Sequence, residues 1–232
     1  MLLGIKSSKQ LLLRHLVVAL LSGTLIFAFF LSRPEWSAGH RLWKATGDAA
    51  FILLFLVLMI GPLAKLYKPF VRFVSWRREL GIWFAVVSLI HAYVVIDGWM
   101  NWDLMRLLGW QYVPQLGREL MVNPGLGLAN LMGLVALFWA VVLAATSADR
   151  AVSYLGISSW KWLHYFTYVI FYLVALHSIY FMFIQYSASP TQPNPPDPNW
   201  FRFPLLIMSL LVPAAQITAF IKTVWKNRQS GD

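Results

Sequence analysis

The chain has 232 residues, of which 59% are hydrophobic and 16% are aromatic, and it carries a formal net charge of +10. This composition is far from that of a soluble globular domain. There is no cysteine, which excludes a disulfide scaffold, a cysteine-ligated zinc or iron–sulfur site and a thiolate haem ligand. The basic residues flank long apolar runs, so the positive charge favours a membrane protein over a nucleic-acid-binding one.

Six apolar stretches come near the length of about 20 residues that a membrane-spanning helix needs. Two of them are rich enough in aromatic and branched residues to favour strands locally, but an open strand leaves backbone groups unsatisfied in lipid, so helices are preferred. We therefore predict an all-α, polytopic membrane protein, a single domain over residues 1–232 built as a six-transmembrane-helix bundle. The predicted spans are 11–32, 47–67, 80–99, 125–147, 160–184 and 203–223. The first is too long for a signal-peptide core and is predicted to be retained.

The distribution of lysine and arginine predicts the orientation of the bundle. With the N-terminus inside, the inner side holds thirteen basic residues: Lys6, Lys9, Arg14, Lys65, Lys68, Arg72, Arg77, Arg78, Arg150, Lys161, Lys222, Lys226 and Arg228. The outer side holds six: Arg33, Arg41, Lys44, Arg106, Arg118 and Arg202. This bias predicts that both termini are cytoplasmic.

Two long connections are predicted on the outer side. Residues 100–124 carry aromatic residues among scattered charges and are predicted to form an interfacial segment. Residues 187–200 are rich in proline and polar residues and are predicted to be an extended loop. No glycine-rich turn of a soluble nucleotide-binding domain is present, so a redox protein of this kind would need a membrane carrier or a separate polypeptide as its electron donor.

Histidines inside the apolar stretches are the candidate functional residues, because ionisable side chains in a membrane span are costly and rarely idle. His91 and His177 are each predicted about 20 Å from the inner end of their spans. Haem iron accepts imidazole nitrogen at its axial positions, and histidines on two helices at matching depth can hold one haem between them. The pair His91 and His177 is therefore predicted to ligate a haem.

His164 lies near the inner end of the fifth span, three residues beyond Lys161. The position of matching depth on the third span is occupied by Arg77 or Arg78, which suit haem propionates better than iron. His15 is an alternative second ligand opposite His164, although interfacial solvation or packing is its simpler role. His40 is predicted to be solvated in an outer loop.

The spacing of the two histidines in the fifth span presents a geometric difficulty. They are thirteen residues apart, which on an ideal helix places them roughly 140° apart around the axis. Either a local distortion of the helix or two haems approached from different sides would reconcile them, and the sequence leaves both open.

The chain resembles the ferric-reductase-like transmembrane domain family, most closely its small haem-binding bacterial branch, the MsrQ (YedZ) membrane subunits. The resemblance covers roughly residues 45–185. It rests on four segments: TGDAAFILLFLVLMIGPLAKLYKP, RRELGIWFAVVSLIHAYV, LGRELMVNPGLGLANLMGLVALFWAVVLAATS and LGISSWKWLHYFTYVIFYLVALH.

The resemblance implies a b-type haem protein of the bacterial inner membrane, acting as the electron-transfer subunit of an oxidoreductase system. It implies haem ligation by His91, His164 and His177, with one haem b or two, and it leaves open whether FMN also binds. The implied donor is quinol or a cytoplasmic flavin reductase. The implied acceptor is a periplasmic molybdenum enzyme that repairs oxidised methionine.

Two other classes of function remain as alternatives. One is a ferric or oxygen reductase that passes electrons directly to a small molecule. The other is a non-redox membrane scaffold or transporter whose histidines only pack.

Overall fold

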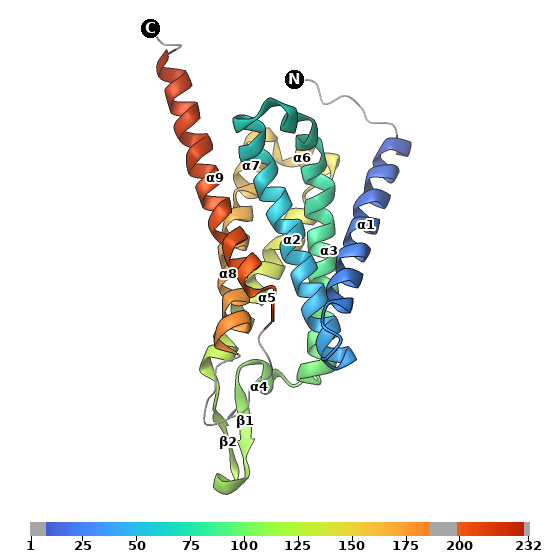
Figure 1. The fold of residues 1–232 in the computed structure, drawn as a ribbon, viewed down its shortest axis with the longest axis vertical. Helices are drawn as coiled ribbons and strands as arrows, with labels where there is room; N and C mark the ends of the chain where they lie inside the picture. Colours follow the sequence, from blue (N-terminus) through green and yellow to red (C-terminus); the bar gives the residue numbers. More distant parts are fainter. Residues whose placement is uncertain (1–7, 186–198, 230–232) are drawn as a thin grey trace. The chain divides into compact units, whose positions relative to one another are not determined.

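The computed structural model describes residues 8–185 and 199–229 of the chain (Figure 1). In this part of the chain, six helical segments are long and apolar enough to cross a membrane, and each overlaps one predicted span. Their bounds are Lys9–Leu31, Ala38–Leu66, Lys68–Met100, Pro124–Ala145, Ile157–Ile184 and Arg202–Gln229. The predicted all-α membrane fold is thus confirmed.

The described residues fall into two compact units. The first, within residues 1–88 and 212–232, contains α1 (Ser8–Leu31), α2 (Ala38–Leu66), the 3₁₀ helix η1 (Lys68–Trp76), the start of α3 (Arg77–Val95) and the end of α9 (Arg202–Gln229). The second, residues 89–211, contains the remainder of α3 and of α9 and every element between them. The single-domain organisation stays a prediction.

In the first unit, α2 supplies much of the buried core and packs against α1. Small residues on α2, among them Ala45, Ala49 and Ala50, are buried and let a neighbouring helix approach closely. The helix begins at Ala38, earlier than predicted, because the Ser37 side chain accepts a hydrogen bond from the backbone N–H of His40. Hydropathy missed these first turns because they are polar.

In the second unit, the order of elements after α3 is η2 (Ile96–Met100), α4 (Leu104–Leu107), β1 (Trp110–Val113), η3 (Pro114–Leu116), β2 (Arg118–Met121), α5 (Pro124–Ala145), α6 (Asp149–Leu155), α7 (Ile157–His164), α8 (Phe166–Ile179) and η4 (Tyr180–Ile184). The segments η2 and η4 are π-helical. Figure 1 shows α5 beside α8, and the two helices pack directly on each other.

The connection 100–124, predicted as an interfacial segment, contains the short helix α4 and an antiparallel hairpin of β1 and β2. In the hairpin Trp110 pairs with Met121 and Val113 pairs with Arg118. The turn ends at Gly117, whose φ of 62° lies in the left-handed region that favours glycine. These strands are the one departure from an all-helical chain among the described residues.

The base of the hairpin is fixed to the start of α5 by very close backbone packing. A Cβ added at Gly109 would lie 2.0 Å from the carbonyl oxygen of Asn123, and one added at Gly127 would lie 2.2 Å from that of Leu108. The Asn130 side chain also donates a hydrogen bond of 2.8 Å to the carbonyl of Leu107. The hairpin therefore projects from a rigid attachment.

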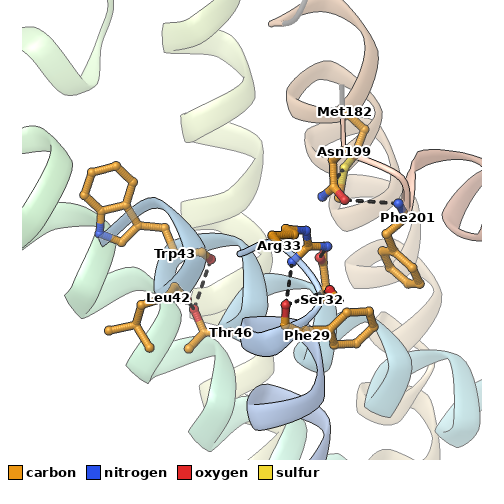
Figure 2. A network of polar contacts seen from close by, with 10 residues as sticks. Phe29, Ser32, Arg33, Leu42, Trp43, Thr46, Met182, Asn199 and Phe201 are labelled. Carbon is orange, nitrogen blue, oxygen red and sulfur yellow. Dashed lines mark hydrogen bonds and ion pairs between the residues drawn. The ribbon is translucent and has the colours of Figure 1, made fainter. Parts of the chain in front are cut away.

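Most of the predicted outer loop 187–200 lies outside the described residues. Its end, at Asn199, is buried within the second unit. The Asn199 side chain accepts a hydrogen bond of 3.0 Å from the backbone N–H of Phe201 and donates to the sulfur of Met182 at 3.2 Å (Figure 2).

Candidate functional site

His177 lies in the last turn of α8, on the side that meets α5. Its Nδ1 is 2.7 Å from the carbonyl oxygen of Ala129 on α5. A carbonyl only accepts hydrogen bonds, so Nδ1 carries the proton and donates it. Nε2 is then the nitrogen with the lone pair, which is the arrangement an imidazole needs in order to ligate iron while its other nitrogen is held by the protein.

The close approach of His177 to α5 depends on a glycine one turn further along that helix. A Cβ added at Gly133 would lie 2.8 Å from Nδ1 and 2.9 Å from Cε1 of His177. Both separations are shorter than carbon makes with such atoms in real structures, so any larger residue would displace the imidazole. One face of α5 consists of small residues at helical spacing: Ala129, Gly133, Ala136 and Ala140. This face lets α8 pack closely against α5.

The segment that follows His177 is anchored to the beginning of α5. The Tyr180 hydroxyl donates a hydrogen bond of 2.9 Å to Oδ1 of Asn123. The same oxygen accepts from the backbone N–H of Leu126 at 3.1 Å, which caps α5. The Phe181 ring lies 4.9 Å from the His177 imidazole, centroid to centroid. The residues that follow His177 in the chain are thus held against α5 and against the imidazole.

His164 is the last residue of α7, where the predicted fifth span is interrupted. Its ring lies 4.1 Å from that of Trp160, and its backbone carbonyl accepts a hydrogen bond of 2.8 Å from the Thr167 hydroxyl. Backbone bonds from Tyr165 to Trp162 and from Tyr168 to Tyr165 tighten the chain here into turns of the 3₁₀ kind.

This interruption bears directly on the angular offset between the two histidines of the fifth span. Each 3₁₀ step turns the chain about 120° in place of about 100°. A few such steps between His164 and His177 therefore narrow the offset expected for an ideal helix. A local distortion, one of the two possibilities that the spacing left open, is present.

His91 lies near the end of α3, in the same unit as His164 and His177, and is half-buried. Five residues beyond it, the helix widens into the π-helical segment η2. All three predicted haem ligands are therefore on helices of the second unit. Among the described residues, no group of three or more histidine, cysteine, aspartate or glutamate side chains is placed to hold a metal ion.

The two arginines predicted to meet haem propionates begin α3. The Nε of Arg77 donates a hydrogen bond of 3.1 Å to the carbonyl of Val57 on α2, and its guanidinium lies over Gly61. Arg78 is half-buried. Arg77 thus joins α3 to α2, and a propionate role for either arginine stays a prediction.

The two remaining histidines belong to the first unit. His15 is half-buried on α1. His40 was predicted to be solvated in a loop, but it lies in the first turn of α2 and stacks on the Trp36 ring at 4.4 Å. Packing on an aromatic ring, rather than solvation, is therefore its role in this structure.

Three buried charged residues in the first unit were not predicted as functional from the sequence. Arg33 and Asp48 form a buried ion pair, and Figure 2 shows Arg33 also donating to the carbonyl of Phe29 at the end of α1. Glu79 on α3 is fully buried, and its Oε1 lies 4.0 Å from Nη1 of Arg14 on α1. Burial of a charge requires such a partner, but a lone charged residue in a sequence does not reveal which partner it has.

Residues 46–175 match the protein family described as "Ferric reductase like transmembrane component". His91 and His164 lie inside the matched region, and His177 lies just beyond its end.

Several curated bacterial proteins are similar to the chain. One is the protein-methionine-sulfoxide reductase heme-binding subunit MsrQ of Pectobacterium carotovorum, 31% identical over 135 residues that cover 58% of this chain and 61% of that protein. The MsrQ of Caulobacter vibrioides is 29% identical over 152 residues, covering 65% of this chain and 64% of the relative. The magnetosome protein MamZ of Paramagnetospirillum magneticum is 32% identical over 135 residues, but these cover only 18% of that longer protein.

The chain thus spans less than two thirds of the length of the MsrQ proteins it matches. The family match covers more than half of the chain and coincides with the helices that contain the candidate site. The chain is a multi-pass protein of the bacterial inner membrane, and it belongs to the ferric reductase like transmembrane component family.

Proposed function

We propose that the protein is a b-type haem electron carrier of the inner membrane, with His91 and His177 as the axial ligands of one haem. The observation that carries the proposal is the hydrogen bond from Nδ1 of His177 to the Ala129 carbonyl. Metal-ligating histidines almost always donate their second ring nitrogen in this way, which fixes the tautomer and raises the basicity of the ligating nitrogen.

The residues present fit a haem in three respects. The chain has no cysteine, so thiolate ligation is excluded, and its five histidines supply imidazole, the usual axial ligand of a b-type haem. His177 is oriented by a backbone carbonyl and by the close approach at Gly133. The surrounding aromatic and aliphatic side chains of α5 and α8 exclude water, which is the protein's means of adjusting a redox potential. When bound, haem supplies a one-electron couple between ferric and ferrous iron.

His164 is proposed as a ligand of a second haem, nearer the opposite end of the same span. With the termini cytoplasmic, as the distribution of basic residues favours, this end faces the cytoplasm. Arg77 and Arg78 are the proposed partners of the haem propionates, which arginine can pair bidentately. His15 is the candidate for the second ligand opposite His164, and an FMN at this side is a further possibility within the same proposal.

The proposed donor is quinol or a cytoplasmic flavin reductase, and the proposed acceptor is a periplasmic methionine-sulfoxide reductase of the molybdenum class. The name of the MsrQ relatives, as heme-binding subunits of such a reductase, supports this acceptor. The hairpin of β1 and β2 is the proposed exit surface, because its base is bonded to Asn123 and Asn123 is bonded to Tyr180, three residues from His177.

Substitution of the proposed ligands tests the function. Purified His91→Ala and His177→Ala variants should each lose the absorbance of the haem that this pair ligates, because bis-imidazole ligation fails when either ligand is removed. His40→Ala is the matched control, since His40 packs on Trp36 at the beginning of α2. Full haem absorbance in either ligand variant would refute the pairing.

The family description favours a second candidate, direct reduction of ferric iron or oxygen. Reduction of a ferric chelate by the purified, reduced protein, at rates equal to those with a methionine-sulfoxide reductase present, would support this alternative. A strict requirement for the protein acceptor would exclude it.

A further inference from the structure

The segment η1 (Lys68–Trp76), which joins α2 to α3 in the first unit, has no buried residue. Several of its apolar side chains are exposed to solvent: Val71 is 56% exposed, Val74 is 42% exposed, and Tyr67, just before η1, is 60% exposed. Exposed apolar residues that adjoin one another in this way mark a surface that contacts something other than water.

The 3₁₀ geometry of η1 sorts its side chains into three columns, because residues i and i+3 eclipse each other at three residues per turn. One column is aromatic: Phe70, Phe73 and Trp76. The second has Lys68 at its start and continues with Val71 and Val74. The third contains Pro69, Arg72 and Ser75. Two columns are thus largely apolar, and the cations lie at their borders.

The segment is fixed to the helices beside it. Nη1 of Arg14 on α1 donates to both the carbonyl and the hydroxyl of Ser75, each at 3.0 Å, and the guanidinium lies 5.0 Å from the Trp76 ring. Within η1, the rings of Phe70 and Phe73 are 5.7 Å apart, and the Arg72 guanidinium lies 4.8 Å from the Phe73 ring. These contacts hold the exposed side chains of η1 in a fixed orientation.

The position of η1 relative to the membrane follows from the length of the helical segment that contains it. The continuous helical segment Lys68–Met100 has 33 residues, whereas about 20 residues suffice to cross a bilayer. Arg77–Met100 alone is long enough to span. The preceding η1 must then lie at the surface of the membrane, where an amphipathic segment places its apolar side chains among lipid chains and its cations among headgroups.

The exposed charge around η1 is positive. Lys65, Lys68 and Arg72 are exposed, and Lys222 of α9 is bonded to the carbonyl of Leu66 at 2.8 Å, which brings the basic end of α9 to the same place. Among the described residues 60–80 and 215–229, the only acid is Glu79, which is fully buried near Arg14. An anionic ligand is the electrostatic complement of this surface.

We propose that the η1 surface, defined as Tyr67, Lys68, Val71, Arg72, Phe73 and Val74, binds an anionic phospholipid. The valine and aromatic side chains would contact the acyl chains, and Lys68 and Arg72 would contact the phosphate. The positive-inside rule accounts for the number of cations at this end, but it does not account for the exposed apolar side chains of Val71, Phe73 and Val74 beside them. The proposal is independent of haem binding.

Lipid binding by the full-length protein tests this proposal. Native mass spectrometry of the detergent-purified protein, titrated with phosphatidylglycerol or with phosphatidylcholine, should show preferential retention of the anionic lipid. Each basic residue near an anionic surface contributes about 1 kcal/mol, which is about a fivefold change in affinity, so Lys68→Gln/Arg72→Gln should weaken binding of phosphatidylglycerol about 30-fold.

The matched control is Arg150→Gln/Lys161→Gln, which removes two exposed cations from α6 and α7. It should leave the preference for phosphatidylglycerol intact, as should the charge-conserving Lys68→Arg/Arg72→Lys. The proposal is overturned if the wild type shows no preference between the lipids, or if the η1 variant and the control behave alike. Displacement of the lipid by millimolar inorganic phosphate would also overturn it, because the site would then be one for free anions.

Discussion

Nδ1 of His177 donates a hydrogen bond of 2.7 Å to the backbone carbonyl of Ala129, across the interface of α8 and α5. A main-chain carbonyl cannot be removed by substitution, so the orientation of this imidazole is determined by how closely the two helices approach. The packing of α8 on α5 therefore contributes directly to holding the proposed ligand.

Gly133→Ala should therefore impair haem binding although Gly133 provides no ligand. The added Cβ would lie 2.8 Å from Nδ1 of His177, so the ring must move and its bond to Ala129 must weaken. Loss of such a supporting hydrogen bond typically weakens metal binding about 10- to 100-fold. Haem retention on dilution and the electron paramagnetic resonance spectrum of the ferric protein measure the effect.

Gly23→Ala is the control for Gly133→Ala. Gly23 also lies inside a membrane helix, but nothing lies within 4 Å of a Cβ added there. The substitution raises helix propensity as much as Gly133→Ala does, but the variant should keep the wild-type spectrum. Equal spectra and equal haem retention in both glycine variants would show that the close approach at Gly133 has no part in positioning His177.

Removal of one partner of the buried Arg33–Asp48 pair should destabilise the protein strongly. Arg33→Met leaves the Asp48 carboxylate without its arginine, and loss of one member of a buried pair typically costs about 3–5 kcal/mol. Unfolding by sodium dodecyl sulfate in mixed micelles measures this cost. The double variant Arg33→Met/Asp48→Leu should recover most of the lost stability, because two apolar side chains of similar volume leave no buried charge without a partner. A double variant as unstable as the single one would contradict this expectation.

The attachment of the hairpin should depend on Gly109 and Gly127. Alanine at either position would bring a Cβ to within about 2.2 Å of a backbone carbonyl oxygen, so the hairpin base must separate from α5. We expect faster cleavage by trypsin after Arg118 in the intact protein in nanodiscs. Gly117→Ala is the comparison: its φ of 62° makes alanine unfavourable, but nothing lies within 4 Å, so its effect should be confined to the turn.

Both termini should be cytoplasmic if the basic residues orient the bundle. A green fluorescent protein fused after Asp232 should fluoresce, and alkaline phosphatase fused at the same place should be inactive. A phosphatase inserted at the hairpin turn, next to Gln115, should be active. The reverse pattern would place the His177 end of α8 toward the cytoplasm and would invert the proposed direction of electron transfer.

Hydropathy alone predicted the six membrane spans. Every crossing of a bilayer needs about the same length of apolar chain, and it must be helical so that the backbone hydrogen bonds are satisfied within the segment. The hairpin at 110–121 was not predicted, since strands of four residues carry too little alternation to distinguish them from an interfacial segment. The spacing of the two histidines left a local distortion open, but the position of the break after His164 could not be predicted, because no proline or glycine marks it.

Of the candidate site, only the histidines that could ligate haem were predicted from the sequence. His91, His164 and His177 stand out because a histidine in an apolar span is unusual. Ala129 and Gly133 do not stand out, because one acts through its main chain and the other through the absence of a side chain. Such contributions become visible only when the two helices are placed side by side.

The haem content of the purified wild-type protein tests the central claim most directly. After expression with ample haem, the ratio of haem to protein and the reduced-minus-oxidised spectrum should show at least one b-type haem per chain with bis-imidazole features. A colourless protein that is folded, monodisperse and unable to take up added haem would contradict the account.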